Sequence, residues 1–161
     1  MTALDLLRDD LARSYDGDTW HGDPLHVLLD GLGAQTAASH PVAGAHSVWE
    51  IVLHLASWME VGALRVAARS ALPMDPAADW PPAPLRPDDA AWAAALRRLG
   101  AAHQALLSAV DGLEERDVWT PLGPRDRAQG TGGPVAYLLS GLAQHAAYHG
   151  GQIALLRKGR G

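Results

Sequence analysis

The chain has 161 residues and a formal net charge of −5, and this length predicts one domain with its own core over residues 1–161. The acidic balance and the scattered arginines argue against a nucleic-acid partner, because a basic stripe is the electrostatic footprint of such binding. The chain contains no cysteine, which excludes disulfides, a thiolate nucleophile and a zinc finger, so any metal ion must be held by histidine and carboxylate side chains.

The apolar residues are largely alanine and leucine, and phenylalanine is absent from the chain. This composition favours close-packed helices over a sandwich rich in aromatic and β-branched residues, so we expect an all-α fold. The first ten residues are acidic where a signal peptide would be basic, and no apolar run approaches the roughly 20 residues of a membrane span. We therefore expect a cytoplasmic protein that does not enter the membrane.

The first predicted helix covers residues 4–15, where leucines recur at helical spacing. Asp16-Gly17-Asp18 interrupts this pattern. We expect the helix to resume over residues 20–32, and residues 34–45 to form a loop.

A second helix is predicted from Ser47 to about Ser70. Ser47 is a favourable N-cap, and Glu50 stands three residues later at the spacing of a capping box. Residues 73–87 contain six prolines. Because proline lacks the N–H donor and restricts the residue before it, we expect this connection to be non-helical.

A third helix is predicted over residues 88–111, and residues 120–133 form a second long connection. Pro134 opens the last helix, which runs to about Lys158. Four amphipathic helices with long connections predict a four-helix bundle, a fold that builds metal sites from inward-facing side chains. Gly150-Gly151 lies inside the last helix and costs about 2 kcal/mol relative to alanine, so either the helix frays there or its backbone lies close to another group.

Three histidines occupy positions where the helical pattern calls for core residues. His145 and His149 are four residues apart, so they lie about one turn apart on one face of the last helix, and His54 falls on the inward face of the second. A single core histidine is more often bonded to a backbone carbonyl. Several buried imidazoles without partners would cost about 1–3 kcal/mol each, whereas one divalent metal ion binds three nitrogens at once. The pattern therefore favours a mononuclear site at His54, His145 and His149 that suits Zn²⁺, Ni²⁺ or Fe²⁺.

Other residues near these histidines have candidate roles. Glu50 is either a general base or acceptor for His54, or simply the helix cap, and the cap is the commoner role. His21 is a candidate substrate-facing base at the mouth of the pocket. Gln144 and Gln152 are candidates for orienting the ring N–H groups, and Trp58 for an apolar wall of the site.

Two stretches carry a family resemblance. His46 to Glu60 (HSVWEIVLHLASWME) and His145 to Ile153 (HAAYHGGQI) resemble the two signature stretches of the DinB-like family, and Trp20 to Leu25 (WHGDPL) extends the similarity. The resemblance implies a four-helix bundle that binds a divalent metal and forms homodimers. It also implies that His54, His145 and His149 are the metal ligands.

The resemblance leaves the reaction open, because the family includes thiol-dependent transferases and isomerases and fold does not settle function. Three histidines leave a coordination position open, and a metal lowers the pKa of a water or thiol bound there. The first hypothesis is a metal-dependent enzyme, either a thiol-cofactor-dependent transferase or a hydrolase, with a small-molecule substrate or a low-molecular-weight thiol as partner. The alternative is a non-catalytic metal-binding or stress-related bundle.

A symmetric homodimer is also expected from the helices themselves. Their Ala-rich faces leave more apolar surface than the interior of one small bundle needs, and a two-fold contact would cover the excess. The first and third long helices are the predicted interface, because the helices that carry the ligands turn their apolar faces to the site.

Overall fold

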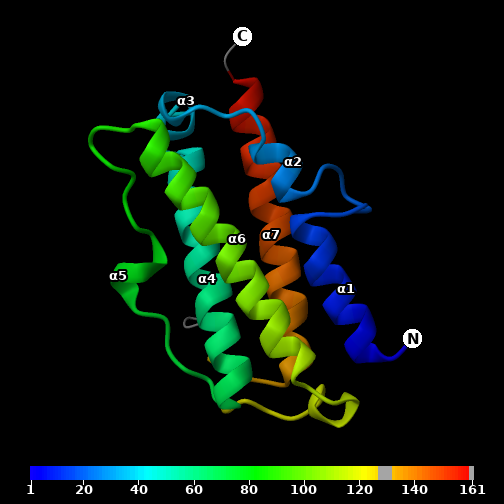
Figure 1. The fold of residues 1–161 in the computed structure, drawn as a ribbon. Helices are drawn as coiled ribbons and strands as arrows, with labels where there is room; N and C mark the ends of the chain where they lie inside the picture. The colour runs from blue at the N-terminus through cyan, green and yellow to red at the C-terminus, as the bar shows by residue number, and fades with distance from the viewer. Residues whose placement is uncertain (127–131, 160–161) are drawn as a thin grey trace.

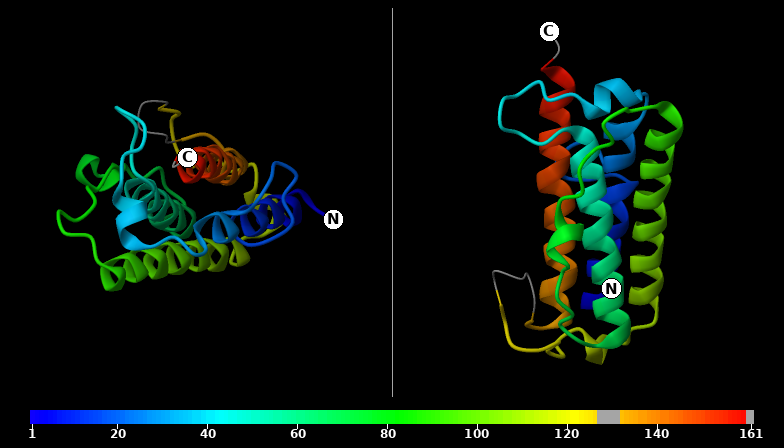
Figure 2. Two further views of the ribbon diagram at one scale, coloured as in Figure 1. Left: turned by 90° about the horizontal axis from the view of Figure 1, so that it is seen from above. Right: turned by 90° about the vertical axis from the view of Figure 1, so that its left-hand side faces the viewer.

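The computed structural model describes residues 1–126 and 132–159, and all regular secondary structure in these residues is helical. Four long helices lie side by side: α1 (Ala3–Tyr15), α4 (Val48–Ala68), α6 (Asp89–Asp111) and α7 (Val135–Lys158) (Figure 1). The end-on view shows these helices grouped around a common interior (Figure 2). The predicted all-α fold is confirmed.

Helix α4 begins where its sequence predicts. The Ser47 hydroxyl accepts a hydrogen bond from the Glu50 N–H at 3.2 Å, and the Glu50 carboxylate accepts one from the Ser47 N–H at 2.7 Å. This reciprocal capping box binds two backbone N–H groups that have no partner within the helix. The helix ends at Arg69, whose left-handed conformation (φ 51°) terminates the ladder.

The predicted helix over residues 20–32 is wrong at its start. Only residues 25–29 are helical there, as the short helix α2 (Leu25–Leu29), and Pro24 is its N-cap. Gly22 has a φ of +132°, outside the range of a right-handed helix, and proline disfavours helical geometry in the residue before it. The segment from Asp16 to Pro24 therefore separates α1 from α2.

Two more short helices lie in segments that the sequence predicts to be irregular. Helix α3 (Ala34–Ala38) is capped from a distance, because the Asp89 carboxylate at the start of α6 accepts a hydrogen bond from the Ala34 N–H at 3.1 Å. Helix α5 (Pro76–Asp79) has proline at its first position, where the missing N–H costs nothing. The long connection between α4 and α6 is thus partly helical.

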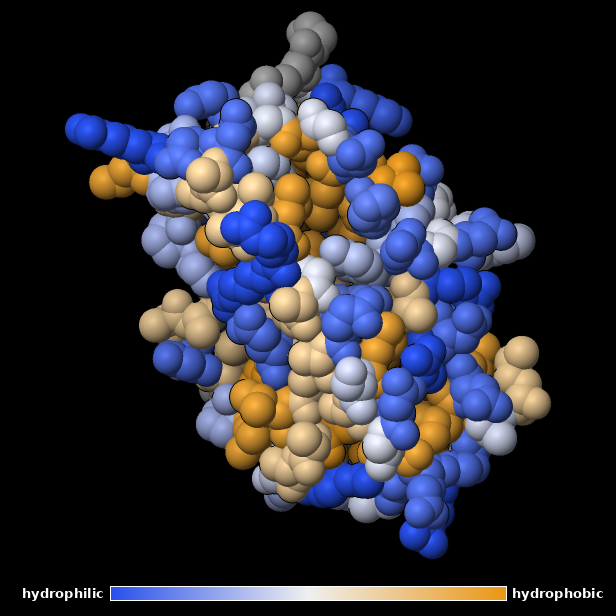
Figure 3. Space-filling model, in the orientation of Figure 1, coloured by the Kyte–Doolittle hydropathy of each residue, from blue (hydrophilic) through white to orange (hydrophobic). Residues whose placement is uncertain are grey.

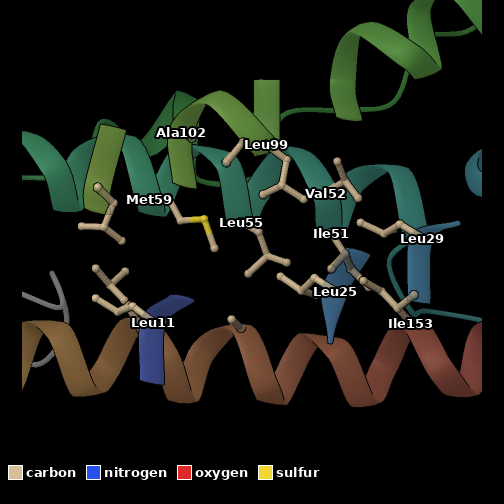
Figure 4. Close-up of a cluster of buried hydrophobic side chains, with 14 of the residues drawn as sticks. Leu11, Leu25, Leu29, Ile51, Val52, Leu55, Met59, Leu99, Ala102 and Ile153 are labelled. Carbon is tan, nitrogen blue, oxygen red and sulfur yellow. The ribbon is translucent and has the colours of Figure 1, made fainter. Parts of the chain in front are cut away.

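The core lies between the long helices, and α4 contributes more buried residues to it than α6 or α7. Leu55 and Met59 of α4 and Leu25 of α2 are at most 2 % exposed, and Figure 4 shows them between α4 and α7. Burying each such side chain contributes roughly 1.5–3 kcal/mol. This packing fixes α4 against α7, the two helices that carry the three histidines.

Helix α4 is, by length and composition, apolar enough to cross a membrane, so the expectation that no apolar run reaches this length was wrong. Of the stretch that meets the criterion, 56 % is buried inside the bundle. A core helix surrounded by other helices has this composition because it is covered on most sides. Polar residues cover much of the outer face in Figure 3, with apolar residues between them.

The two consecutive glycines do not interrupt α7, which continues through them to Lys158. A Cβ atom added to Gly150 would lie 3.3 Å from Leu28 Cδ1, whereas one added to Gly151 would have nothing within 4 Å. The helix does not fray at the two glycines. Instead, the backbone lies close to another group, the Leu28 side chain, and only at Gly150.

This difference predicts opposite results for two alanine substitutions. Gly151→Ala is expected to raise the free energy of unfolding by about 0.8–1 kcal/mol, because alanine is the better helix former and the position faces open space. Gly150→Ala is expected to raise the free energy of unfolding by less than this, or to lower it, because the added methyl group would displace the Leu28 side chain. Urea unfolding of both variants measures this, and equal gains would contradict the close approach at Gly150.

Candidate metal centre

The structure brings His54 of α4 together with His145 and His149 of α7. One ring nitrogen from each lies within 4.8 Å of the others. The Nε2 atoms of His54 and His145 are 3.0 Å apart, although 91 residues separate them. His54 and His149 are only 5 % and 4 % exposed and face the bundle interior, as the helical spacing predicts, whereas His145 is partly exposed.

Hydrogen bonds on the far side of two rings determine where their protons lie. His54 Nδ1–H donates to the backbone carbonyl of Asp79 at 2.6 Å, and His149 Nδ1–H donates to the side-chain oxygen of Gln152 at 2.6 Å. A carbonyl oxygen can only accept, so each Nδ1 carries the proton and each neutral ring has its lone pair on Nε2. Metal-binding histidines show the same arrangement, in which the second nitrogen is held by an oxygen acceptor.

The donor set of the triad fits a divalent metal ion. The unprotonated Nε2 of His54 points at the Nε2 of His145, and two lone pairs in this position repel each other unless a proton or a cation lies between them. Nitrogen ligands bound tetrahedrally at the usual metal distance are about 3.3 Å apart, close to the observed 3.0 Å. The site offers three nitrogens and no negative ligand, which suits Zn²⁺, Ni²⁺ or Fe²⁺.

Burial keeps the three rings neutral. Desolvation, followed by the neighbouring His149 and His54, lowers the pKa of His145 to about 3. Desolvation likewise lowers the pKa of His149 to about 4, and that of His54 below its ordinary value. At neutral pH the rings are therefore already deprotonated, which is the form that binds metal.

Two residues at this site lie outside the sequence-based prediction. The Asp79 carboxylate accepts a hydrogen bond from the Trp58 indole N–H at 2.8 Å and lies 3.2 Å from His54 Nδ1. The Trp80 ring stacks on the His54 ring with centroids 3.7 Å apart and planes 8° apart. No helical spacing relates these residues to the triad, and the only sequence signal is an aromatic residue inside a proline-rich connection.

The remaining candidates are placed as follows. Glu50 caps α4, and its carboxylate lies 2.9 Å from His40 Nε2; no contact between Glu50 and the triad is found in the described residues. Gln152 bonds His149, whereas Gln144 donates to the Ser140 hydroxyl at 2.9 Å. Gln152 therefore orients a triad ring, and Gln144 does not.

His21 lies away from the triad. It is exposed in the segment before α2, beside the fully exposed Trp20, and lines a groove with Asp10 of α1 and Ala143 of α7. Within residues 1–126 and 132–159, no contact joins His21 to the three histidines. His21 was predicted at the mouth of the metal pocket; it lines this separate groove instead and not the cavity beside His145.

A cavity of about 260 Å³ adjoins the triad at His145. Its apolar wall includes Trp58, the predicted apolar residue, together with Leu138 and Leu142. Arg65 also lines it; this residue is 1 % exposed, and its Nε–H donates to the Leu72 carbonyl at 2.7 Å. A small molecule in this cavity would contact an apolar wall next to His145.

Comparison with protein families agrees with this geometry. The DinB superfamily pattern matches residues 19–153, which include α4, α7 and the whole triad. No curated protein matches the chain significantly. Proteins of this family bind metal ions, and the buried triad is compatible with that property. Since the match covers most of the chain, this protein belongs to the DinB superfamily.

Proposed function

We propose that the protein is a metal-dependent enzyme, a thiol-cofactor-dependent transferase or a hydrolase, with one divalent ion held by His54, His145 and His149. The ion is Zn²⁺, Ni²⁺ or Fe²⁺ in this proposal. The partner is a small-molecule substrate or a low-molecular-weight thiol. When bound, such an ion supplies Lewis acidity, which polarises a substrate oxygen or lowers the pKa of a thiol.

The cavity beside His145 is the observation that supports catalysis over storage. A site that only stores metal needs no space next to its ligands, and structural metal sites are closed by a fourth protein ligand. Among the described residues, the cluster contains three ligating side chains and no fourth. An open position next to a cavity of about 260 Å³ suits a small substrate.

The residues of the cavity have separate roles in this proposal. The leucines and Trp58 exclude water from the reacting end of the substrate, which strengthens electrostatic interactions there. Gln152 and Asp79 keep the protons of His149 and His54 on Nδ1 and so keep the Nε2 lone pairs available.

Elemental analysis of protein purified without a metal-binding tag tests the first half of the proposal. One bound transition metal per chain is the expected result. A screen of the metal-loaded protein against thiol-transfer and ester substrates tests the second half. Bound metal with no turnover of either substrate class would favour the non-catalytic metal-binding or stress-related bundle. Absence of bound metal would contradict both the enzyme hypothesis and this alternative.

We also propose a homodimer, with a contact different from the one that the sequence suggests. Among the described residues, α6 exposes no large apolar side chain, whereas Tyr137, Tyr148 and Leu155 are 48 %, 66 % and 71 % exposed on α7. These three residues are spaced at multiples of a helical turn and define one outer face of α7. The outer face of α7 is therefore a better candidate interface than α6.

Light scattering measures the assembly. The expected mass is twice the 17.0 kDa of one chain, and Tyr148→Arg with Leu155→Arg is expected to give monomers because it places charge in the contact. Leu85→Arg is the matched control, since Leu85 is fully exposed in the connection between α5 and α6. A monomeric wild type, or a dimer undisturbed by the α7 variant, would contradict this interface.

A further inference from the structure

The proline-rich connection between α4 and α6 passes along the outside of α4 (Figure 2), and Asp79 and Trp80 within it contact the His54 ring. We propose that Asp79 and Trp80, at the end of α5, form a clasp that positions His54 for metal binding. The inference rests on the proposed metal site and assigns these two residues a positioning role in it. Neither residue offers a ligand to the metal cluster itself.

Trp80 fixes the plane of the His54 ring. Its indole lies between two imidazoles: His54 on one face, at 3.7 Å and 8°, and His46 on the other, at 3.7 Å and 7°. His46 lies two residues before α4 and His54 lies in its second turn, so the indole is held at both faces by side chains from the start of α4 and the segment just before it. Rotation of the His54 ring about its Cβ–Cγ bond would break this stack.

Asp79 fixes the direction in which the His54 ring points. Its backbone carbonyl accepts the Nδ1 proton at 2.6 Å, and its carboxylate lies 3.2 Å from the same nitrogen. The Trp58 N–H holds that carboxylate at 2.8 Å, so the acceptor is itself oriented. With Nδ1 held on this side, Nε2 must face His145 and His149. A carboxylate near Nδ1 also makes the ring a stronger electron donor.

The connection is built to hold this position before any ligand binds. Asp75 caps α5 by accepting the Ala77 N–H at 2.9 Å, and Pro76 fixes the first helical residue. Pro81 and Pro82 follow Trp80 directly, and proline restricts both its own backbone and that of the residue before it. Little conformational entropy is therefore lost when the clasp is in place.

The test compares clasp variants with a control from the same connection. Trp80→Ala removes the stack, and Asp79→Ala removes the carboxylate but leaves the backbone carbonyl. Leu85→Ala changes a side chain that is fully exposed in the same connection. Each variant is titrated with Zn²⁺ in competition with a chelator of known affinity, and folding is checked by circular dichroism.

Both clasp variants are expected to bind Zn²⁺ about 10–100-fold more weakly than the wild type, the range measured when an outer-shell partner of a metal ligand is removed. Leu85→Ala is expected to match the wild type. Trp80→Phe keeps a flat ring and is expected to restore most of the affinity. Trp80→Leu keeps the apolar bulk without a flat ring, and it replaces Trp80→Ala if that variant does not fold.

The visible spectrum of bound Co²⁺ separates positioning from a general loss of stability. At saturating Co²⁺, the bands of the Trp80 variants without a flat ring are expected to shift from those of the wild type, because the His54 ring is free to turn. Wild-type affinity and an unchanged spectrum in folded Trp80→Leu and Asp79→Ala would overturn the clasp and leave the triad site standing. Failure of the wild type itself to bind either ion would instead overturn the proposed metal site.

Discussion

Replacement of His145 or His149 by alanine is expected to abolish stoichiometric binding of a divalent metal ion. Each variant loses one of three nitrogens that lie within 4.8 Å of one another, and no fourth histidine or carboxylate belongs to this group in the described residues to replace it. The loss of affinity should exceed the roughly 100-fold that removal of an outer-shell partner causes. Calorimetric titration with Zn²⁺ and Ni²⁺, together with elemental analysis, measures the effect.

Two other histidines serve as controls for this experiment. His26→Ala removes an exposed imidazole from α2 and is expected to leave both metal content and stability unchanged. His103→Ala is expected to leave metal content unchanged but to lower stability, because His103 is 2 % exposed and donates its Nε2–H to the Leu11 carbonyl at 3.1 Å. Full metal content in both the His145→Ala and the His149→Ala variant would contradict the assignment of these histidines as metal ligands.

The metal-free protein is expected to lose stability as the pH falls from 7 to 5. The unfolded chain binds protons on its histidines below about pH 6.5. In the folded state the pKa values of His145 and His149 are about 3 and about 4. The unfolded state therefore binds more protons throughout this window, and the free energy of unfolding decreases with decreasing pH. The expected loss is about 2 kcal/mol for each of these two imidazoles between pH 7 and pH 5.

A double variant isolates the contribution of the triad. His145→Leu/His149→Leu removes both imidazoles, so its free energy of unfolding should fall far less over the same window. His103, whose pKa burial also lowers, is present in both proteins and cancels in the comparison. Carboxylates such as Glu50, whose pKa lies below its ordinary value, lose their contribution at lower pH. Urea unfolding at pH 7, 6 and 5 measures the difference, and parallel curves for the two proteins would contradict neutral, buried triad rings.

Features that depend on near neighbours in the chain could be predicted from the sequence. Ser47 and Glu50 stand three residues apart, and that spacing alone predicts the capping box that begins α4. His145 and His149 stand four residues apart, which places both rings on one face of α7. Their position within an apolar stripe predicts that this face is buried, because only a buried face requires apolar residues at each turn.

The same reasoning was less successful in short segments, where the helical repeat of apolar residues is too brief to identify the structure. The helix predicted over residues 20–32 was shortened by Gly22 and Pro24, whose backbone preferences outweigh the apolar pattern. The one-turn helix α3 depends on a carboxylate that comes from Asp89 in another helix. No local rule identifies such a partner.

The sequence by itself determined the helical class, the ends of α4 and the inward direction of the three histidines, because hydrogen bonds and side-chain faces within one helix repeat at a fixed local period. Only the tertiary structure decided that Asp79 and Trp80 hold the His54 ring, since the path of a proline-rich connection depends on the surface it packs against. It also decided that Gly150, and not Gly151, meets α2, and that Glu50 points to His40 rather than to the triad. These are contacts between segments, and their geometry is set by how whole helices pack.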